Sequence, residues 1–433
     1  MNFDITIIGG SFAGMTAALS LAKISPDLKI AVIEKQDIVS QDKKRDGRAY
    51  AISSASLKLF KEIGIYDELS PNAGRISDIK ITDHKSPFIL DFIGLEVDEK
   101  DGQLGQIIEN YHIHNALRNR LLQQKNITLF CPNFYEEIEF LKDGPRHEDG
   151  VTSEGEFARD KRGAATTEGE FVTTCLSRGP LTDSNVLIKL DNKKIIQSKL
   201  LLACDGRFSP LRKLYQIPTS QKDYHQTAIV FNISHQFSHE NIAHEKFLPG
   251  GPLAILPFKD QHQSSIVWIV SEQQAQAILS LDEENFLHQL NKKMENILGK
   301  VLLNSEKFSY PLIAIEAEKF YHEKILFIGD AACGVHPIAG QGFNLAIAGI
   351  KILCDLVKNN LFCGLDISSR NLIESYNKKA KSGAKKMLIA TDILNSLFEN
   401  KSLSIGLVRD FGLGLVNKLP TLKKFFIKNA GGF

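Results

Sequence analysis

Short apolar runs alternate with segments of helical period along the first part of the chain. Residues 3–8 and 29–33 are short apolar runs, and between them the apolar positions of residues 15–23 recur with helical spacing. Short apolar runs are typical of buried strands, and two such strands around one helix form the βαβ unit of a parallel sheet. The pattern therefore predicts an α/β fold that begins with a βαβ unit.

The rest of the chain contains further segments of both kinds. Helical spacing predicts helices at residues 53–69, 111–124, 282–298 and 346–357, and from residue 370 onward. Alternating or continuous apolar patterns predict strands at residues 75–95, 127–141, 186–190, 195–203, 227–233, 253–257, 264–270 and 324–328. Glycine-proline turns separate the strands of residues 224–310, so we expect an antiparallel sheet there that can carry a substrate pocket.

Residues 142–184 interrupt this alternation. Glycine, threonine, serine and charged residues dominate the segment, and residues 153–157 are nearly repeated at 167–171. Such a composition offers too little apolar surface to form a core. We therefore predict a low-complexity, disordered surface insertion without a catalytic role, which a loop tolerates at little cost in stability.

Composition narrows the class of protein. A chain of 433 residues is longer than a single hydrophobic core usually supports, which favours two or three domains. With 43% apolar and 24% charged residues, the composition is typical of a soluble globular protein. A net charge of +1 argues against a nucleic-acid partner. No run is long and apolar enough to span a membrane, and the N-terminus lacks the basic region of a secretory signal. The scattered cysteines show no metal-ligand spacing, so we expect reduced thiols and no metal site.

A glycine-rich turn joins the first predicted strand to the first helix. Gly9, Gly10 and Gly14 lie in this turn, and Glu34 follows the second strand. Backbone N–H groups at such a helix start bind a pyrophosphate, and the acid binds the ribose hydroxyls of a dinucleotide. Ser11 replaces the middle glycine of the usual motif. Because serine is small and can itself bond phosphate, we expect binding to survive.

A second glycine-rich loop follows the predicted strand 324–328 and precedes the apolar helix 346–357. Asp330 in this loop is suited to the ribityl hydroxyls of a flavin rather than to a phosphate. Gly340 and Gly342 allow the backbone to approach a flat ring closely. The loop therefore predicts a flavin site; the alternative is a strand-to-helix turn whose glycines serve tight packing.

Three further positions are candidates for cofactor contacts. Arg48 precedes a helix and is a candidate for the pyrophosphate or ring region, although a surface arginine fits the same pattern. Gln106 lies where a strand meets a helix, so a flavin contact and a structural role are both open. Asp205 and Gly206 form a turn after a buried strand. That turn presents a carboxylate to the cofactor, but Asp-Gly is also a common turn without a ligand.

The C-terminal segment is basic. Residues 378–433 contain eleven lysines and arginines against three acids, hence a net charge of +8, and apolar residues are interleaved with them. A basic amphipathic segment predicts docking on an anionic membrane surface. Helices packed on the core with a solvated lysine face are the alternative, and both interpretations stay open.

The motifs in this order resemble those of the class A flavin-dependent aromatic hydroxylases, and within them the ubiquinone-biosynthesis ring hydroxylases of the UbiH/UbiF type. The segments that carry the resemblance, besides the N-terminal turn, are residues 46–49, 104–110, 251–257, 336–345 and 391–394. The resemblance spans the chain apart from the insertion 142–184. Ser11 departs from the family pattern, as do residues 346–350, where the family has a glycine and an Arg-Asp pair.

The resemblance implies an FAD-dependent monooxygenase that hydroxylates the aromatic ring of a polyprenylated phenol in ubiquinone biosynthesis. NAD(P)H is implied as a transient electron donor, and O₂ as the co-substrate that reacts through a flavin C4a-hydroperoxide. Pro337 and the backbone from Gly340 to Asn344 are implied to line the reacting edge of the flavin. His336 is a candidate base, although a histidine before a proline in a packed turn also suits a structural role.

The implied architecture is a Rossmann-like FAD-binding domain of the GR2 type, an antiparallel β-sheet substrate domain and a helical C-terminal section. The FAD-binding domain is assigned residues 1–74, 101–141, 185–220 and 320–358. The substrate domain is assigned residues 75–100 and 221–319, and the helical section residues 359–433. We expect a cytoplasmic protein, peripheral on the inner face of the membrane, with a ubiquinone-biosynthesis complex as a further partner.

Two other functions use the same cofactor domain. A flavin-dependent prenyl-lipid reductase would deliver hydride to a double bond, and a flavin-containing scaffold of a lipid-biosynthetic complex would have no activity. No second dinucleotide motif is present for a stably bound nicotinamide, so NAD(P)H binds transiently or a reductase partner replaces it.

Overall fold

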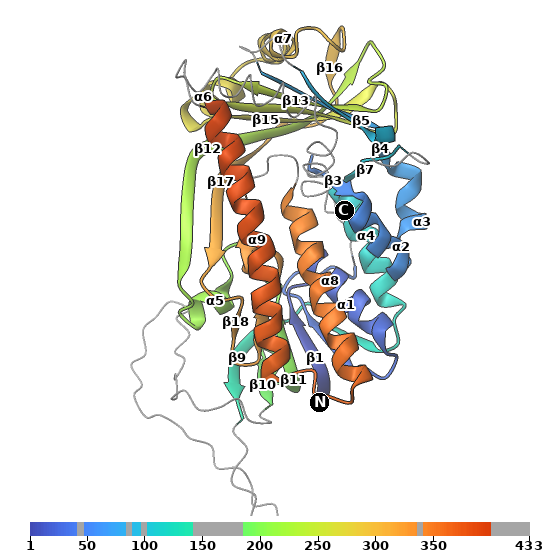
Figure 1. Cartoon of the computed structure of the whole chain (residues 1–433), viewed down its shortest axis with the longest axis vertical. Coiled ribbons are helices and arrows are strands. Elements are labelled where there is room, and N and C mark those ends of the chain that lie inside the picture. Colours follow the sequence, from blue (N-terminus) through green and yellow to red (C-terminus); the bar gives the residue numbers. More distant parts are fainter. Residues whose placement is uncertain (41–46, 84–88, 97–101, 142–184, 336–340, 400–433) are drawn as a thin grey trace, which may run out of the picture.

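The structure is a computed structural model and describes residues 1–40, 47–83, 89–96, 102–141, 185–335 and 341–399. Two large sheets stand at opposite ends of the molecule, with a small sheet and helices between and beside them (Figure 1). The insertion 142–184, which the sequence predicts to be disordered, lies outside the described residues.

A largely parallel sheet contains the predicted βαβ unit. Its strands along the sheet are β18 (Tyr321–His322), β19 (Ile325–Phe327), β11 (Ile195–Ala203), β1 (Asn2–Ile8), β2 (Ile30–Ile33) and β8 (Ile127–Phe130), and β9 (Tyr135–Phe140) and β10 (Val186–Leu190) extend it from β11. Strand β1 is buried on both faces, as parallel strands require: Ile5 and Ile7 on one face and Thr6 on the other are all inaccessible to solvent. The predicted α/β class is therefore confirmed.

Helices cover this sheet. They include α1 (Phe12–Ile24), α4 (Asn110–Leu122), α8 (Gln341–Phe362) and α9 (Arg370–Glu399). The shorter helical elements of this part of the chain are α2 (Ser54–Ile63), α3 (Tyr66–Leu69), α5 (Pro210–Leu214) and the 3₁₀ turns η1 (Ser70–Asn72) and η3 (Gly329–Ala331), and the 3₁₀ turn η2 (Gly94–Glu96) follows β6 (Leu90–Ile93) of the second large sheet. The apolar residues of α1 and α8 join the buried residues of β1 and β11 in one core. Within the described ranges, none of the helices is long and apolar enough to cross a membrane.

The second large sheet is mainly antiparallel. Its strands are β20 (Cys333–Gly334), β17 (Phe308–Ala317), β12 (Thr219–His235), β15 (Gln263–Ser271), β14 (Gly251–Pro257), β13 (Ile242–Leu248), β5 (Asp78–Asp83) and β6 (Leu90–Ile93), with β16 (Val301–Leu303) beside β12. One face packs on α6 (Glu272–Leu279) and α7 (Glu283–Met294) around Phe286, Trp268 and Phe231. The other face points toward the remainder of the molecule (Figure 1).

A small sheet connects the two large ones. It consists of β3 (Ala49–Ser53), β7 (Gly105–Glu109) and β4 (Gly74–Ile76). Ile107 and Leu104 pack with Ala243 of β13 and with Phe258, which directly follows β14. The residues assigned to the FAD-binding and substrate parts therefore meet across this contact, while the exact domain boundaries stay predictions.

Several predicted helices differ in extent. The segment predicted as one helix over residues 53–69 breaks at Gly64, whose φ of 77° is left-handed and whose N–H caps α2. The helix predicted over 282–298 ends at Met294, because Glu295 turns into the left-handed region. Helix α6 was missed, although Ser271 and Gln274 form a capping box at its start.

Helix α9 links the two large sheets. The hydroxyl of Tyr376 donates a hydrogen bond of 3.0 Å to the carbonyl of Phe327 in β19. Near the other end of the helix, Asp392 accepts hydrogen bonds from Tyr224 Oη at 2.6 Å and Lys222 Nζ at 3.0 Å, both on β12. The antiparallel sheet is therefore held in position over the parallel sheet from one side.

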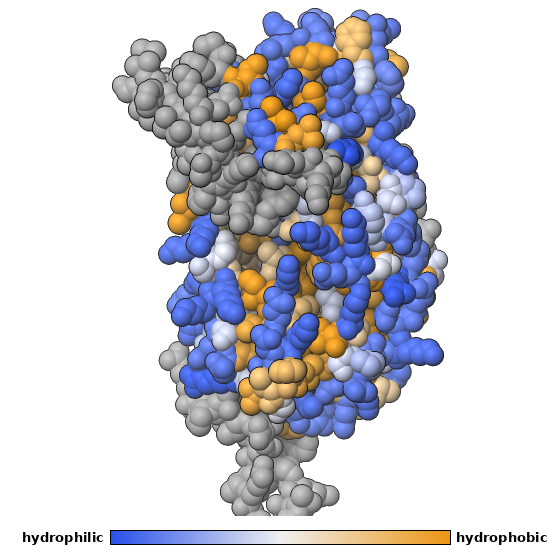
Figure 2. Space-filling model, turned by 45° about the vertical axis from the view of Figure 1, so that its right-hand side comes forward, coloured by the Kyte–Doolittle hydropathy of each residue, from blue (hydrophilic) through white to orange (hydrophobic). Residues whose placement is uncertain are grey.

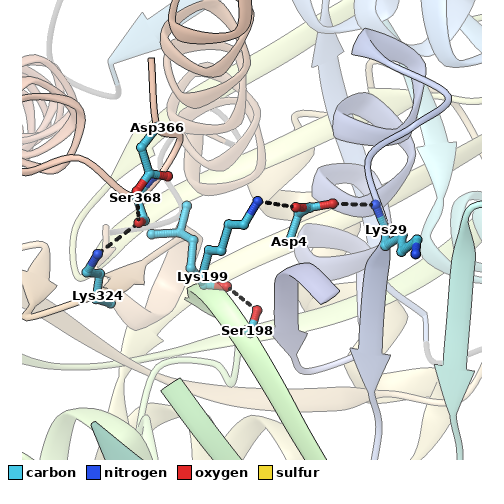
Figure 3. Close-up of polar contacts among 8 residues, drawn as sticks. Asp4, Lys29, Ser198, Lys199, Lys324, Asp366 and Ser368 are labelled. Atoms are coloured by element: carbon cyan, nitrogen blue, oxygen red, sulfur yellow. Dashed lines mark hydrogen bonds and ion pairs between the residues drawn. The ribbon is translucent and has the colours of Figure 1, made fainter. Parts of the chain in front are cut away.

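A polar cluster joins the C-terminal helices to the start of the parallel strands. Buried Lys324 donates to Ser368 Oγ at 2.8 Å, and Ser368 donates to Asp366 at 2.8 Å (Figure 3). Beside them, Lys199 of β11 pairs with Asp4 of β1 at 2.8 Å. These contacts lie at the strand ends away from Gly9, so they serve the fold rather than the glycine-rich turns.

The described part of the basic C-terminal segment is the second half of α9. Ala380 and Ala384 are buried against the core, and the exposed lysines of this stretch are Lys378, Lys379, Lys385 and Lys386. As far as Ile389, the helix therefore fits the interpretation of a packed helix with a solvated lysine face. Hydrophilic side chains also cover most of the face in Figure 2, with apolar side chains in small patches between them. Residues 400–433 lie outside the described residues.

Candidate functional site

The candidate residues converge at one edge of the parallel sheet. Gly9 follows β1, Glu34 follows β2, Asp205 lies just beyond β11, and Asp330 follows β19. These strands are neighbours and run parallel, so their carboxyl ends meet on the same side. Ligands of open α/β sheets bind at the carboxyl ends of the strands. The four motifs that the sequence singles out therefore form one site.

The N-terminal turn needs its glycines for steric reasons. Gly9 has a φ of 103°, and a Cβ atom there would lie 2.4 Å from the carbonyl oxygen of Cys204. A Cβ atom on Gly14 would lie 1.8 Å from the carbonyl oxygen of Gly9. Ser11 is the N-cap of α1, but its side chain makes no capping hydrogen bond and is exposed. The serine that replaces a glycine is therefore exposed at the helix start and does not cap the helix with its side chain.

Glu34 lies directly against this turn. One carboxylate oxygen accepts a hydrogen bond from Gly10 N at 2.5 Å, and the other accepts from Gln36 N at 2.7 Å. A Cβ atom on Gly10 would lie 2.8 Å from the Cβ atom of Glu34. The predicted acid and the predicted glycine turn are thus in contact, as a ribose site beside a pyrophosphate site requires.

Asp205 has one engaged and one unengaged oxygen. Oδ2 accepts from Ser209 Oγ at 2.8 Å and from Leu211 N at 3.1 Å, which fixes the turn. Oδ1 is buried and has no hydrogen-bond partner among the described residues. Burial raises the pKa of Asp205, and the hydrogen bonds from Ser209 and Leu211 oppose the rise. A buried orphan acceptor fits a ligand that donates, such as a ribityl hydroxyl, and does not fit a phosphate.

Asp330 is influenced by two arginines, one of them in direct contact. Arg207 Nη2 is 3.5 Å from Asp330 Oδ2, and 38% of the Asp330 side chain is exposed. Burial raises the pKa of Asp330, whereas the positive charges of Arg207 and, more weakly, Arg48 lower it. The guanidinium carbon of Arg48 also lies 5.6 Å from the ring centre of Tyr310. Asp330 is thus held beside cations, with part of its carboxylate open to a ligand.

Sequence reasoning missed Arg207 and Arg212. Arg212 is 3% exposed, and it donates to the carbonyl of Ala331 at 2.7 Å and to that of Arg207 at 2.6 Å. It therefore clamps the turn that carries Asp205 to the turn that carries Asp330. A pattern along the chain could not find this role, because the two turns are far apart in sequence.

The side chain of Asn344 connects the start of α8 to the small sheet. Its Oδ1 accepts from Ser53 N at 3.0 Å and Ser56 Oγ at 2.8 Å, and its Nδ2 donates to the carbonyl of Ala51 at 2.8 Å. These bonds engage both ends of the amide and fix the small sheet to the start of α8. The polar groups of the Asn344 side chain are therefore already engaged within the protein. The predicted contact with the cofactor remains a prediction for the backbone of Asn344 only.

The structure gives fewer contacts for the remaining residues that were predicted to bind the cofactor. Gln106 donates to Tyr66 Oη at 3.0 Å, and its Oε1 is buried without a partner among the described residues. Among the described residues, a Cβ atom on Gly342 would meet only Val335, at an ordinary 3.8 Å, so their packing does not require glycine there. Gly206 has a φ of 87°, which its turn requires. His336, Pro337 and Gly340 lie outside the described residues.

Solved structures show the same fold. The p-nitrophenol 4-monooxygenase PnpA of Pseudomonas putida superimposes with a TM-score of 0.72 at 13% identity, covering 99% of this chain and 98% of that one. A variant of Klebsiella pneumoniae HpxO complexed with FAD gives a TM-score of 0.68 at 12% identity, covering 99% of both chains. At these identities the likeness establishes the fold alone.

Curated relatives are similar over nearly the whole of this chain and most of their own length. The ubiquinone hydroxylase UbiL of Rhodospirillum rubrum is 29% identical, with 99% of this chain and 89% of the relative covered. The ubiquinone hydroxylase UbiM of Neisseria meningitidis is 27% identical, with coverages of 100% and 85%. The mitochondrial ubiquinone biosynthesis monooxygenase COQ6 of Dictyostelium discoideum is 25% identical, with coverages of 99% and 91%.

A family model gives the assignment. The model described as "FAD binding domain" matches residues 156–391. This match includes the turns of Asp205 and Asp330 and the start of α8. Because it covers more than half of the sequence, the chain belongs to the FAD binding domain family, and FAD is its cofactor.

Proposed function

We propose that this protein is an FAD-dependent monooxygenase that hydroxylates the aromatic ring of a polyprenylated phenol in ubiquinone biosynthesis. The observation that carries the proposal is the meeting of Gly9, Glu34, Asp205 and Asp330 at one sheet edge, in a chain whose relatives are named ubiquinone hydroxylases. The same relatives give no support to the reductase or scaffold functions.

The chain's own residues fit the parts of FAD. The turn from Gly9 to Gly14 and the start of α1 suit the diphosphate, and Glu34 suits the adenosine ribose. The unengaged oxygen of Asp205 and the exposed part of Asp330 suit the ribityl hydroxyls. When bound and reduced, FAD supplies the electrons that activate O₂ for transfer to a ring carbon.

The sheet that faces the site suits an apolar phenol. Ala228, Val230, Ile269 and Leu312 form a buried cluster on one face of the antiparallel sheet, and Tyr310 packs against it. Tyr310 also lies under Arg48, which acts electrostatically on Asp330. A ring bound on this face would be close to the cofactor residues and away from water, which protects reactive oxygen species from side reactions.

The proposal also includes three partners. They are NAD(P)H as a transient electron donor, a membrane surface and a ubiquinone-biosynthesis complex. The exposed lysines of α9 supply positive charge for an anionic surface, at about 1 kcal/mol for each residue close to it. A polyprenyl substrate dissolves in the membrane, so docking of the protein on the inner face would bring substrate and site together.

The experiment is an isotope measurement. The purified protein, loaded with FAD, receives NADH or NADPH, a phenol with a short prenyl chain, and ¹⁸O₂. The proposal predicts a product that contains one ¹⁸O atom on the ring and consumption of O₂ with substrate. A product that gains two hydrogens and no ¹⁸O would instead identify a reductase and overturn the proposal.

A further inference from the structure

The apolar cluster that the proposed function assigns to the substrate is closed in this structure. Its four members form a surface that we call the substrate wall, and each is only 2–6% exposed: Ala228, Val230, Ile269 and Leu312. A phenol ring cannot contact these side chains unless neighbouring parts of the molecule move. The proposed function, on which the inference rests, therefore requires that the wall can open.

A two-stranded ribbon of β12 and β17 connects the antiparallel sheet to the cofactor site (Figure 1). In one part of the ribbon, residues 219–223 pair with residues 313–317. This part is fixed to the cofactor site, because β17 also pairs with β20, just after the turn of Asp330. In the other part, residues 227–230 pair with residues 308–311 and carry the substrate wall. The ribbon thus belongs to both halves of the molecule.

A bulge separates the two parts of the ribbon. Residues 224–226 of β12 lie opposite Leu312 alone, so the pairing of the strands shifts there. His225 in this bulge has a φ of 51°, in the left-handed region that few side chains adopt. Bulges interrupt the ladder and bend a strand, and hinges are short segments that absorb changes in φ and ψ. The antiparallel sheet can therefore tilt relative to the cofactor site at this bulge.

Asp392 of α9 holds the bulge. Its Oδ1 accepts a hydrogen bond from Tyr224 Oη at 2.6 Å, within the bulge, and one from Lys222 Nζ at 3.0 Å, just before it. The ammonium group of Lys222 also lies 4.8 Å from the ring centre of Tyr224. The ring of Tyr224 packs against the substrate wall. One carboxylate therefore ties a residue beside the wall and a residue of the fixed part of the ribbon to the same helix.

The contacts on the two sides of the antiparallel sheet differ in chemistry. On the β13 side, Ala243 and Ile107 belong to one buried apolar cluster. On the β12 side the contact is ionic and partly exposed, with 51% of the Lys222 side chain and 39% of the Asp392 side chain accessible. Water replaces the partners of exposed charged groups at little cost, whereas separating an apolar contact loses its whole burial. The sheet is therefore expected to open on the β12 side.

We propose that Asp392 is a positioning residue that latches the β12 bulge to α9, and that release of this latch opens the substrate wall to the polyprenylated phenol. The latch consists of Lys222, Tyr224 and Asp392. When it is closed, the wall lies over the cofactor site and water is excluded, which protects reactive oxygen species from side reactions. When it is open, substrate enters and product leaves. Asp392 acts through Tyr224 and does not itself contact the substrate.

The first test measures opening without substrate. Ala228→Cys places a thiol on the wall, and its modification by a small neutral alkylating reagent is followed in the FAD-loaded protein by peptide mass spectrometry. Adding Asp392→Ala removes the latch and is expected to raise the rate of modification about tenfold, the range of a hydrogen bond to a charged group. Tyr224→Phe keeps the ring and is expected to act in the same direction. In combination with Asp392→Ala it is expected to add nothing, because the two residues share one contact.

Two further variants separate a latch from a general loss of packing. Asp392→Asn keeps an acceptor for Tyr224 and is expected to recover part of the protection of the thiol. Glu374→Ala is the matched control, since Glu374 is an exposed acid of the same helix that pairs with Arg370 of α9 at 2.7 Å. It is expected to leave the rate of modification at the wild-type value.

The second test uses the binding of a short-chain prenylphenol, followed in rapid mixing by the absorbance change of the flavin. Because opening precedes binding, the binding rate of the wild type is expected to reach a plateau at high phenol concentration. The plateau is expected to be about tenfold higher in Asp392→Ala. Hydroxylated product per O₂ consumed is expected to fall in this variant, with the balance released as H₂O₂, because water reaches the site.

Urea denaturation shows whether each variant is folded, and Tyr224→Phe decides if Asp392→Ala is not. A rate of modification that is unchanged in the latch variants, or that rises equally in Glu374→Ala, overturns the inference. If the wild type binds the phenol but hydroxylates nothing, the proposed function fails. In that case the modification of the introduced thiol still decides whether the latch controls the wall.

Discussion

The guanidinium of Arg207 lies 3.5 Å from the carboxylate of Asp330, which joins the turn after β11 to the turn after β19. Arg212 reinforces this junction through the carbonyls of Ala331 and Arg207. The two turns therefore form one rigid unit at the edge of the sheet. Asp330 is the member of that unit whose carboxylate remains partly open to a ligand.

Asp330→Ala is expected to weaken FAD binding by roughly tenfold to a hundredfold, the range of a charge-assisted hydrogen bond. Titration of the FAD-free protein with FAD, followed by fluorescence, measures the dissociation constant. Asp355→Ala, which removes an exposed acid from α8, is the control and is expected to keep the wild-type value. An Asp330→Ala protein that binds FAD like wild type would exclude Asp330 from the site.

Gly14→Ala is expected to destabilise the fold by about 3 kcal/mol or more. The new methyl group would lie 1.8 Å from the carbonyl oxygen of Gly9, and the backbone cannot move there without breaking the turn. Gly383→Ala on α9 is the control, since a Cβ atom there meets none of the described residues within 4 Å. It is expected to stabilise by about 0.5–1 kcal/mol, because alanine loses less entropy in a helix. Urea denaturation measures both, and equal effects would contradict the steric argument.

Asn344→Ala is expected to cost about 2–4 kcal/mol of unfolding free energy. It leaves the buried N–H of Ser53 and the carbonyl of Ala51 without their partner, and each unsatisfied group costs about 1–3 kcal/mol. Asn359→Ala removes an exposed asparagine from the same helix and is expected to change stability by about 0.5 kcal/mol or less. If the midpoints of the two variants in urea coincide, Asn344 does not hold the small sheet to α8.

The buried Glu245 predicts a pH-dependent stability difference. Its pKa is about 7 in the folded protein against 4.5 for the free side chain, so the folded state binds more protons between these values. Stability is therefore lost as the pH rises from about 4.5 to about 7, by about 3 kcal/mol in all. Glu245→Gln does not titrate and avoids this loss.

The measurement is the unfolding free energy of wild type and Glu245→Gln from about pH 4 to about pH 8. The advantage of the variant is expected to grow across this range by about 3 kcal/mol. A difference that is constant with pH would mean that Glu245 has a partner that keeps it ionised. The prediction is independent of catalysis, so it tests the burial of the carboxyl group directly.

The parts of the fold that follow from local pattern were predictable. The strands at residues 186–190 and 195–203 have the predicted bounds, and the βαβ unit with Glu34 beside Gly10 appears where the motif placed it. Continuous apolar runs and glycine turns are properties of a few neighbouring residues, so a sequence displays them. The sequence displays the capping box of helix α6 as well, although no helix was predicted there.

The parts that depend on tertiary pairing could not be predicted. Arg207 and Arg212 resemble any pair of arginines after a turn until the turn after β19 is placed against them. Glu245 resembles a surface glutamate in a strand with charged neighbours, and only the sheet register shows which face it occupies. The roles of His336 and Pro337, outside the described residues, stay predictions.

The central claim is best tested by the quinone-lipid mass profile of a bacterial host that lacks its own ubiquinone ring hydroxylases. The host expresses either wild type or Asp330→Ala. Our account predicts that ubiquinone, or a more oxygenated intermediate, returns with wild type only, and that the restored oxygens identify the ring positions. Identical profiles for the two proteins, with FAD bound to the purified wild type, would contradict a function in ubiquinone ring hydroxylation.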